Sequence, residues 1–144
     1  MDSYLARFQP DGDGYLVTFP DIPEAITGGR TLSEALANAQ DGLEVALLTY
    51  AGDGRPLPTP SPRPAEGGSF RRISVPAAIV AKLAFIDAFR ASGMTQVALA
   101  AKLGKGETEV RRMLDPYHKT KLPTIEAGLR ALGKRLVVRV EEAA

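Results

Sequence analysis

The sequence predicts an α+β protein of two small domains joined by a proline-rich linker. Residues 54–68 (GRPLPTPSPRPAEGG) hold five of the eleven prolines in the chain. Proline fixes its own φ and lacks a backbone N–H, so such a run favours a stiff extended spacer. Before this segment, strand-like alternation precedes one helical pattern, whereas most of the chain after it has helical periodicity. The predicted boundaries are residues 1–55 and 69–144 for the domains and residues 56–68 for the linker.

Charge is distributed unevenly between the two parts. Residues 1–68 carry four basic and ten acidic side chains, a net of −6, whereas residues 69–144 carry fourteen basic and seven acidic ones, a net of +7. This asymmetry favours two partners of opposite charge, with nucleic acid as the partner of the basic part.

Composition excludes several classes of protein. The chain has no cysteine, which rules out a disulfide framework, a cysteine-based zinc site and a thiol nucleophile. It has neither an apolar run of about 20 residues nor the pattern of a secretory signal. We therefore expect a cytoplasmic protein that does not enter the membrane.

The acidic part predicts three strands and a helix. Residues 3–19 alternate apolar and polar positions on either side of PDGDG, which indicates a hairpin with a tight turn. The inward faces of these two strands would carry Tyr4, Ala6 and Phe8, and then Tyr15, Val17 and Phe19. A short β-like piece, AITGGR, comes next, and residues 31–50 have helical periodicity. Thr31 and Glu34 have the spacing of a capping box at the start of this helix.

Four carboxylates, Asp11, Asp13, Asp21 and Glu24, lie close together in the acidic part. Clustered carboxylates can hold Mg²⁺ for phosphodiester cleavage, which makes a nuclease one interpretation. The same residues suit a hairpin turn and a proline-flanked turn, and they lack the spacing of a calcium loop. We therefore expect turn chemistry, with no catalytic residue, no metal and no cofactor.

The basic part predicts a short strand, FRRISV, and then a helix that begins at Pro76 and ends at Gly93. Two short helices follow within residues 94–116. Thr95 would cap the first helix, and Gly104 would permit a left-handed turn before the second. Two short helices joined by a glycine-containing turn are typical of a helix-turn-helix, although a purely structural helical hairpin has the same pattern.

The C-terminal segment, KRLVVRVEEAA, alternates apolar and polar residues, which predicts a strand. A lone strand needs a partner, either FRRISV, the same segment of a second chain, or both. Leu136, Val138 and Val140 are therefore the predicted dimerisation residues. We expect a homodimer, with a tetramer as the larger alternative, since repressors usually read two half-sites.

The acidic part resembles the N-terminal domain of HicB antitoxins. The resemblance rests on residues 11–47 (DGDGYLVTFPDIPEAITGGRTLSEALANAQDGLEVAL) and the following PLPTPS, and it covers residues 4–62. The sequence departs from the common pattern at Glu24-Ala25 and at residues 28–30. The resemblance implies a partial ribonuclease-H-like fold without nuclease activity, and a HicA-like, mRNA-cleaving toxin as partner. Asp13, Asp21 and Glu24 are the expected toxin-contacting residues.

Residues 93–136 resemble helix-turn-helix repressors of the phage Cro and repressor type. This implies binding to double-stranded operator DNA, with Gln96 at a phosphate and Glu107, Thr108 and Arg112 facing base edges. Phosphate contacts, which set affinity and register, are expected from Lys105, Arg111, Lys119 and Lys121. His118 has no partners at metal-ligand spacing, so we expect it to meet solvent or a phosphate.

These observations together predict a non-enzymatic antitoxin that binds its toxin through the acidic part and represses its own operon through the basic part. Two alternatives stay open. A stand-alone helix-turn-helix regulator would need a ligand pocket in residues 1–55, and a nuclease would need a Mg²⁺ site at the four carboxylates.

Overall fold

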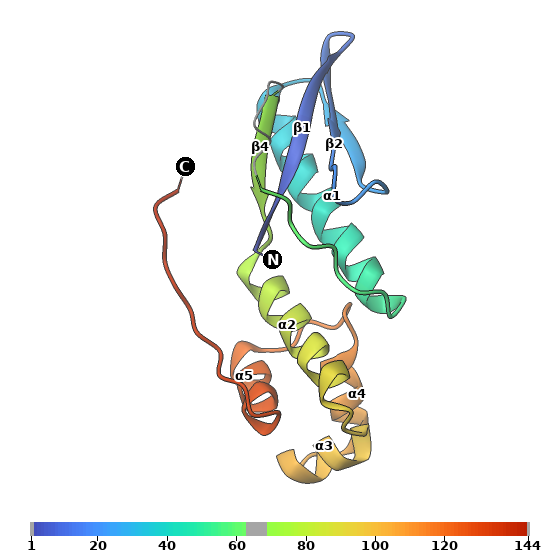
Figure 1. Cartoon of the computed structure of the whole chain (residues 1–144), viewed down its shortest axis with the longest axis vertical. Coiled ribbons are helices and arrows are strands. Elements are labelled where there is room, and N and C mark those ends of the chain that lie inside the picture. Colours follow the sequence, from blue (N-terminus) through green and yellow to red (C-terminus); the bar gives the residue numbers. More distant parts are fainter. Residues whose placement is uncertain (1, 63–68, 144) are drawn as a thin grey trace. The chain divides into compact units, whose positions relative to one another are not determined.

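The computed structural model describes residues 2–62 and 69–143. In chain order the elements are β1 (Ser3–Asp11), β2 (Gly14–Thr18), β3 (Ile26–Gly29), α1 (Leu32–Gly52), β4 (Ser69–Ser74), α2 (Ala77–Ser92), α3 (Gln96–Leu103), α4 (Glu107–Leu114) and α5 (Leu122–Ala131) (Figure 1). The chain forms two compact units, residues 1–80 and 81–144, which we call the N-terminal and C-terminal units. The predicted α+β class is confirmed.

The N-terminal unit is a four-stranded antiparallel sheet, ordered β3-β2-β1-β4, with α1 packed against it (Figure 1). The predicted inward face is buried at Tyr4, Ala6 and Phe8 and again at Val17 and Phe19. Helix α1 contributes small and aliphatic residues at every fourth position, namely Ala35, Ala39, Leu43 and Leu47. Burial of these two apolar faces against each other is the main stabilising term of the unit.

Strand β4 gives the chain an organisation that differs from the predicted one. This segment was predicted to belong to the C-terminal domain, but β4 pairs antiparallel with β1, from Ser3 opposite Ser74 to Phe8 opposite Ser69. This pairing occupies the edge of β1 that β2 leaves open. The proline-rich segment is therefore a return connection inside the N-terminal unit, and the boundary between the units falls within α2.

Four hydrogen bonds tie residues 58–61 of the proline-rich segment to the rest of the N-terminal unit, two of them to strands β1 and β4 and two to Asp21 in the turn after β2. The Tyr4 hydroxyl donates to the Pro58 carbonyl at 2.7 Å. The Ser61 N–H donates to Asp21 Oδ2 at 2.7 Å, and the Ser61 hydroxyl donates to the other oxygen of the same carboxylate. Arg72 on β4 donates to the Ser61 carbonyl at 3.0 Å. Residues 63–68 of the predicted linker lie outside the described residues.

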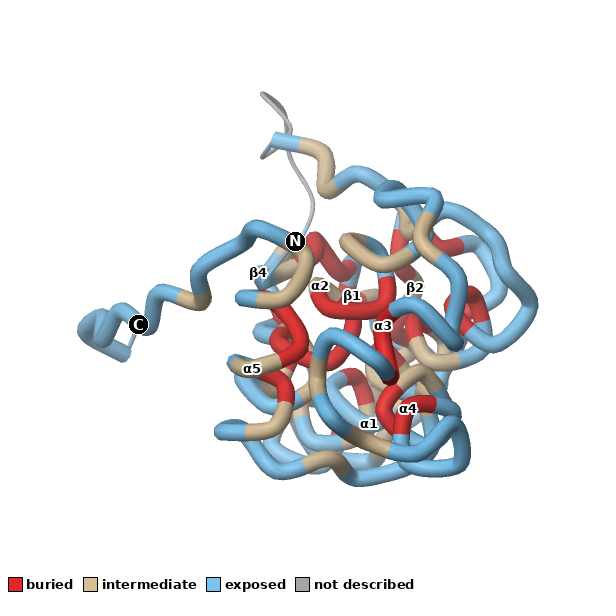
Figure 2. Tube along the Cα trace, turned by 90° about the horizontal axis from the view of Figure 1, so that it is seen from below, coloured by how far each residue is buried: buried red, intermediate tan, exposed pale blue. Residues whose placement is uncertain are grey.

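The C-terminal unit is built from helices around one apolar core. Its buried members include Phe85 and Ile86 from α2, Leu99 from α3, Val110 and Met113 from α4, and Ile125 and Leu129 from α5 (Figure 2). Helices α3 and α4 are joined by residues 104–106 only, and Gly104 adopts the predicted left-handed conformation with φ of 64°. A residue with a Cβ atom would be strained there.

The predicted C-terminal strand is not formed. Residues 134–143 have no regular secondary structure. Val137, Val138 and Val140 are exposed, whereas Leu136 packs against the helical core. A strand is defined by its hydrogen-bonded partner, and none of the strands in the described residues pairs with this segment. Its predicted role in dimerisation stays a prediction.

Both predicted N-caps are present, and their contribution can be measured. Thr31 Oγ1 accepts from the Glu34 N–H and Thr95 Oγ1 from the Ala98 N–H, each at 3.1 Å. We expect Thr31→Ala and Thr95→Ala each to lower the free energy of unfolding by about 1 kcal/mol in urea titrations. Thr49→Ala is the matched control, because Thr49 lies inside α1 and its hydroxyl donates to the Val45 carbonyl. Equal effects of all three changes would contradict the capping role.

Candidate functional site

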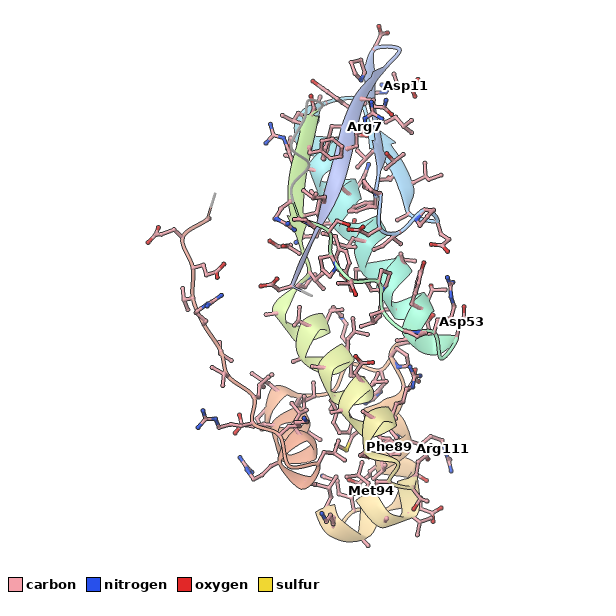
Figure 3. All side chains as sticks on the ribbon, in the orientation of Figure 1. Arg7, Asp11, Asp53, Phe89, Met94 and Arg111 are labelled. Carbon is pink, nitrogen blue, oxygen red and sulfur yellow. The ribbon has the colours of Figure 1, made fainter. Side chains whose placement is uncertain are left out.

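Helix α4 presents four of the eight predicted DNA-contact residues on its outer side. Val110 and Met113 face the core, which leaves the opposite side of the helix to polar residues. These exposed residues are Glu107, Thr108, Arg111 and Arg112, and Gln96 is likewise exposed at the start of α3. Figure 3 shows Arg111 extending outward from α4. The short turn between α3 and α4 therefore leaves a continuous polar face available to a large ligand.

The charged residues of α4 lie at the ends of the helix where the helix dipole stabilises them. Glu107 and Glu109 lie in the first turn, and Arg111 and Arg112 in the last. Both placements are favourable, because the N-terminus of a helix is partially positive and the C-terminus partially negative. Lys105 approaches Glu109 at 3.5 Å, so part of its charge is already compensated. Arg111 and Arg112 have no such ion pair among the described residues.

A basic hollow of about 260 Å³ lies beside the C-terminal end of α4. Its lining brings together four predicted DNA contacts and the lone histidine, namely Lys105, Arg112, Lys119, Lys121 and His118. Glu109 is the acidic residue of the same lining. The hollow therefore has an excess of positive charge and suits a phosphate group. Gln96, Glu107, Thr108 and Arg111 are not part of it.

Lys82, which was not predicted from the sequence as part of a site, bonds two residues that line this hollow, Arg112 and Thr120. Its side chain is 3% exposed, and its ammonium group donates to the Arg112 carbonyl at 3.1 Å and to Thr120 Oγ1 at 2.6 Å. Burial lowers the pKa of Lys82 to about 8, and the negative charge of Asp115 acts in the opposite direction. The sequence did contain a signal for the burial of Lys82, because this residue lies three positions after Ile79 and four before Ile86, on the apolar face of α2.

Two of the predicted toxin contacts, Asp21 and Glu24, already form hydrogen bonds within the N-terminal unit. Asp21 accepts two hydrogen bonds from Ser61. Glu24 accepts from the Tyr50 hydroxyl at 2.7 Å and from Arg55 at 3.2 Å, and the Arg55 guanidinium lies 3.8 Å from the centre of the Tyr50 ring. The Tyr50 hydrogen bond, followed by those of the backbone and Arg55, holds the pKa of Glu24 below its usual value.

The remaining acidic candidates lie at the hairpin. Asp11 ends β1, as Figure 3 shows, and Asp13 is exposed in the two-residue turn, where Gly12 has φ of 58°. Within residues 2–62 and 69–143, no three or more acidic or histidine side chains are grouped so that they could hold a metal ion.

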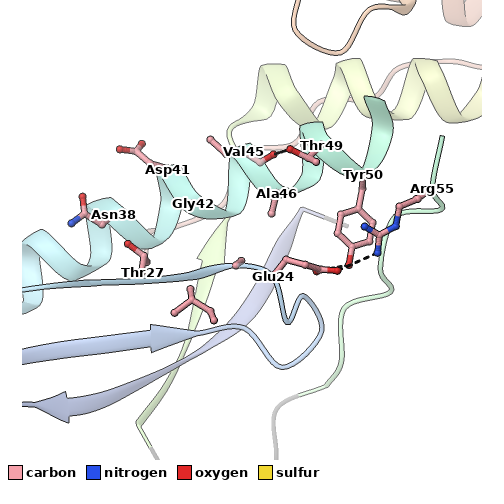
Figure 4. A pocket seen from close by; sticks show the side chains of 12 residues that line it. Glu24, Thr27, Asn38, Asp41, Gly42, Val45, Ala46, Thr49, Tyr50 and Arg55 are labelled. Atoms are coloured by element: carbon pink, nitrogen blue, oxygen red, sulfur yellow. Dashed lines mark hydrogen bonds and ion pairs between the residues drawn. The ribbon is translucent and has the colours of Figure 1, made fainter. Parts of the chain in front are cut away.

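The N-terminal unit also contains a groove of about 460 Å³ between α1 and the strand-edge residues of β3 (Figure 4). Its α1 wall is formed by Asn38, Asp41, Gly42, Val45, Ala46 and Thr49, and the facing wall by residues 24–27. Tyr50 and Arg55 close one end, where they contact Glu24 (Figure 4). This groove was not predicted from the sequence, because it depends on how α1 lies across β3.

Residues 3–84 match a family model described as the HicB_like antitoxin of bacterial toxin-antitoxin system. The chain belongs to the HicB antitoxin family. Antitoxin HicB 2 of Photorhabdus laumondii is 43% identical over 133 residues, which cover 92% of each chain. Antitoxin HicB of Escherichia coli K12 is 39% identical over 127 residues, covering 88% of this chain and 89% of the relative. The family resemblance inferred from the sequence is confirmed.

The HicB family match extends through β4 and into α2, so it spans the sheet as the structure forms it. A crystal structure of the Burkholderia pseudomallei antitoxin HicB is similar with a TM-score of 0.45 and 20% sequence identity, covering 84% of this chain and 99% of that one. Among the described residues of this HicB-family chain, none of the helices combines the length and apolar character that crossing a bilayer requires.

Proposed function

We propose that this HicB-family antitoxin acts through two partners. The N-terminal unit binds and blocks a HicA-like, mRNA-cleaving toxin, and the C-terminal unit represses the operon of the chain by binding its operator in the cytoplasm. The observation that carries the DNA-binding half is the α3–α4 pair, whose three-residue turn and polar outer face lie beside the basic hollow. This arrangement supports a helix-turn-helix in which α4 would be the recognition helix.

The proposed contacts divide into base readers and phosphate binders. Arg112 would pair bidentately with guanine, and Glu107 and Thr108 would meet neighbouring base edges. Phosphates would be bound at the hollow and beside it by Gln96, Lys105, Arg111, Lys119 and Lys121. The negative charge of Glu107 fits this role because it can accept from the amino group of cytosine.

The acidic unit is suited to a basic protein partner. With the boundary at residue 80, the N-terminal unit carries six basic and ten acidic side chains, a net of −4, and the C-terminal unit twelve and seven, a net of +5. Opposite charge steers encounter with an RNA-binding toxin. We also propose that the sheet and α1 are a partial ribonuclease-H-like domain that has no nuclease activity.

Dimerisation is the third part of the proposal. In the C-terminal segment, Val138 and Val140 are 71% and 92% exposed, and Leu136 anchors the segment to the helical core. Pairing with the same segment of a second chain would bury these valines and supply the missing strand ladder. A dimer also fits the reading of two half-sites about 34 Å apart, and two dimers on one operator would form a tetramer.

Operator binding can be tested by fluorescence anisotropy with labelled DNA from upstream of the gene, at two salt concentrations. We expect tight binding that weakens with salt, and a loss of about 1 to 3 kcal/mol in Arg112→Ala. Arg130→Ala is the matched control, because Arg130 is exposed on α5 and pairs with Glu126 outside the hollow. Equal losses in both variants, or wild-type binding no tighter than to unrelated DNA, would contradict the proposed reader.

The groove in the N-terminal unit bears on the alternative function, a regulator that senses a small ligand. A specific ligand site needs a few polar groups that converge on the ligand. In this groove Asn38 already donates to the Gly28 carbonyl at 2.8 Å, and Glu24 is bonded to Tyr50 and Arg55. These internal bonds favour the antitoxin function over ligand sensing.

A further inference from the structure

The groove along α1 and β3 has an apolar character that the fold itself does not use. Ile26 on one wall is 65% exposed, and Val45 on the facing wall is 63% exposed. Among the described residues of the N-terminal unit, these are the large apolar side chains left most open to solvent. Paired apolar residues facing a concavity are typical of a protein-binding surface.

The charge around the groove indicates the kind of partner. Arg55 offsets the charge of Glu24 at the closed end through a contact of 3.2 Å. Asp41 is exposed on the α1 wall, and no hydrogen bond or ion pair of its side chain occurs among the contacts of the described residues. The net charge of the whole unit is −4, from six basic and ten acidic side chains. A complementary partner is therefore a basic protein that projects an apolar side chain.

The backbone edge of β3 makes strand addition a poor mode of binding. β3 is an outer strand of the sheet, but the Asn38 side chain covers the Gly28 carbonyl with a hydrogen bond of 2.8 Å. A strand added at this edge would have to displace that bond and pass under α1. The partner is therefore held by side chains in the groove rather than by a continued sheet.

The groove walls are fixed before any partner arrives. Tyr50 is buried and donates to Glu24, and Arg55 stacks on the Tyr50 ring. These contacts join α1, the segment before β3 and the start of the proline-rich return at one end of the groove (Figure 4). A preformed site loses little conformational entropy on binding, which favours affinity.

We propose that this groove is the surface on which the antitoxin holds its basic toxin, with Ile26 and Val45 as the central apolar contacts and Asp41 as the charged one. The inference rests on the proposed antitoxin function, and it replaces Asp21 and Glu24 as direct contacts, because both already serve internal bonds. Their role is to shape the groove and its surroundings.

The test is isothermal titration of the full-length chain with the small, basic HicA-like toxin that we propose as its partner. We expect Val45→Arg and Ile26→Arg each to weaken binding by about thirtyfold or more, because each places a cation in the centre of the contact. Ala37→Arg is the matched control, since Ala37 is exposed on the same helix but does not line the groove. It adds the same charge, and we expect less than about a threefold change.

Three results would overturn the inference, each in a recognisable way. Wild-type affinity in both groove variants would place the toxin elsewhere while leaving the antitoxin function intact. A change of oligomeric state in Val45→Arg, with toxin affinity unchanged, would make a second copy of the chain the occupant. Failure of the wild-type chain to bind the small protein would remove the antitoxin function together with the groove assignment. Operator affinity and circular dichroism of each variant, unchanged from wild type, show that the variants are folded.

Discussion

Replacement of Gly128 by alanine is expected to destabilise the C-terminal unit by about 2 kcal/mol, although alanine is the better helix former by about 1 kcal/mol. Gly128 lies inside α5, where an added Cβ would be 2.5 Å from Cε1 of Phe85 and 3.0 Å from Cε of Met113. Phe85 is fully buried and Met113 nearly so. Neither side chain can withdraw without disturbing the packed core.

Gly42→Ala is the matched control for this prediction. Gly42 lies inside α1, and the nearest atoms to an added Cβ there are Cβ and Cγ2 of Thr27, both at 3.9 Å. That distance is ordinary contact, so we expect the variant to be more stable by up to about 1 kcal/mol. Urea unfolding followed by amide resonances of each unit separates the two effects. A gain of stability in both variants would show that the α5 contact can relax.

The Gly128 variant also bears on DNA binding. Met113 belongs to α4, so displacement of its side chain shifts the helix that carries Arg112 and the predicted base contacts. We therefore expect Gly128→Ala to lower operator affinity even at temperatures where the unit stays folded, whereas Gly42→Ala leaves operator affinity unchanged.

The second large expected effect is a dependence of the free energy of unfolding on pH that is caused by Lys82. Because burial lowers the pKa of Lys82 to about 8, the unfolded chain binds a proton more readily than the folded one between that value and the ordinary 10.5. Stability therefore rises with pH through this window and is lost as the pH falls back towards 8. The gain in the free energy of unfolding across this whole window is about 3 kcal/mol, which corresponds to the difference between the folded and ordinary pKa of Lys82.

The measurement compares the free energy of unfolding of the wild type and Lys82→Met from pH 7.5 to about 10.5. Methionine keeps a long unbranched side chain in the buried site but cannot titrate, so we expect it to abolish this part of the slope. The difference between the two proteins also cancels the opposing effect of Tyr4, whose pKa burial and Asp21 raise to about 12. The Lys82 Cε resonance should titrate near pH 8 in the same samples.

Lys102→Met provides the control. Lys102 also donates to a backbone carbonyl, that of Ala131 at 3.2 Å, but its residue is exposed. We expect this variant to keep the wild-type dependence on pH. If Lys82→Met keeps it as well, the ammonium group of Lys82 is not the source of the slope.

Local signals in the sequence located most of the elements correctly. Thr31 and Thr95 were recognised as N-caps because a side-chain oxygen three residues before a free N–H is a short-range geometry. The left-handed turn at Gly104 and the alternating face of Tyr4, Ala6 and Phe8 are equally short-range. Such features depend on neighbours in the chain, and the sequence contains those neighbours directly.

Contacts between segments far apart in the chain could not be predicted from such local signals. The β4 segment has a strand-like sequence, but nothing in its residues specifies β1, some 65 positions earlier, as the partner. The proline-rich segment likewise looks like a spacer until Ser61 is seen to bond Asp21 at 2.7 Å. The predicted C-terminal strand had the correct alternation and still lacks a ladder, because alternation describes one strand and a sheet requires two.

The same distinction between short-range and long-range features applies to the candidate sites. The exposed positions of α4 could be predicted from the sequence, because the helical period gives them once Val110 and Met113 are assigned to the core. The gathering of Lys105, Lys119 and Lys121 around one hollow, the support from Lys82 and the groove between α1 and β3 depend on how separate elements meet. Those features became visible only in the folded chain.

The position of β4 limits where evolution could exchange one C-terminal unit for another. A recombination break within the proline-rich segment would transfer β4 to the new module and leave β1 with an open edge. Val75, which is buried and donates to the Asp2 carbonyl at 2.8 Å, still belongs to the sheet side. Exchange without damage to the sheet therefore requires a break between Val75 and the first turn of α2, a window of very few codons.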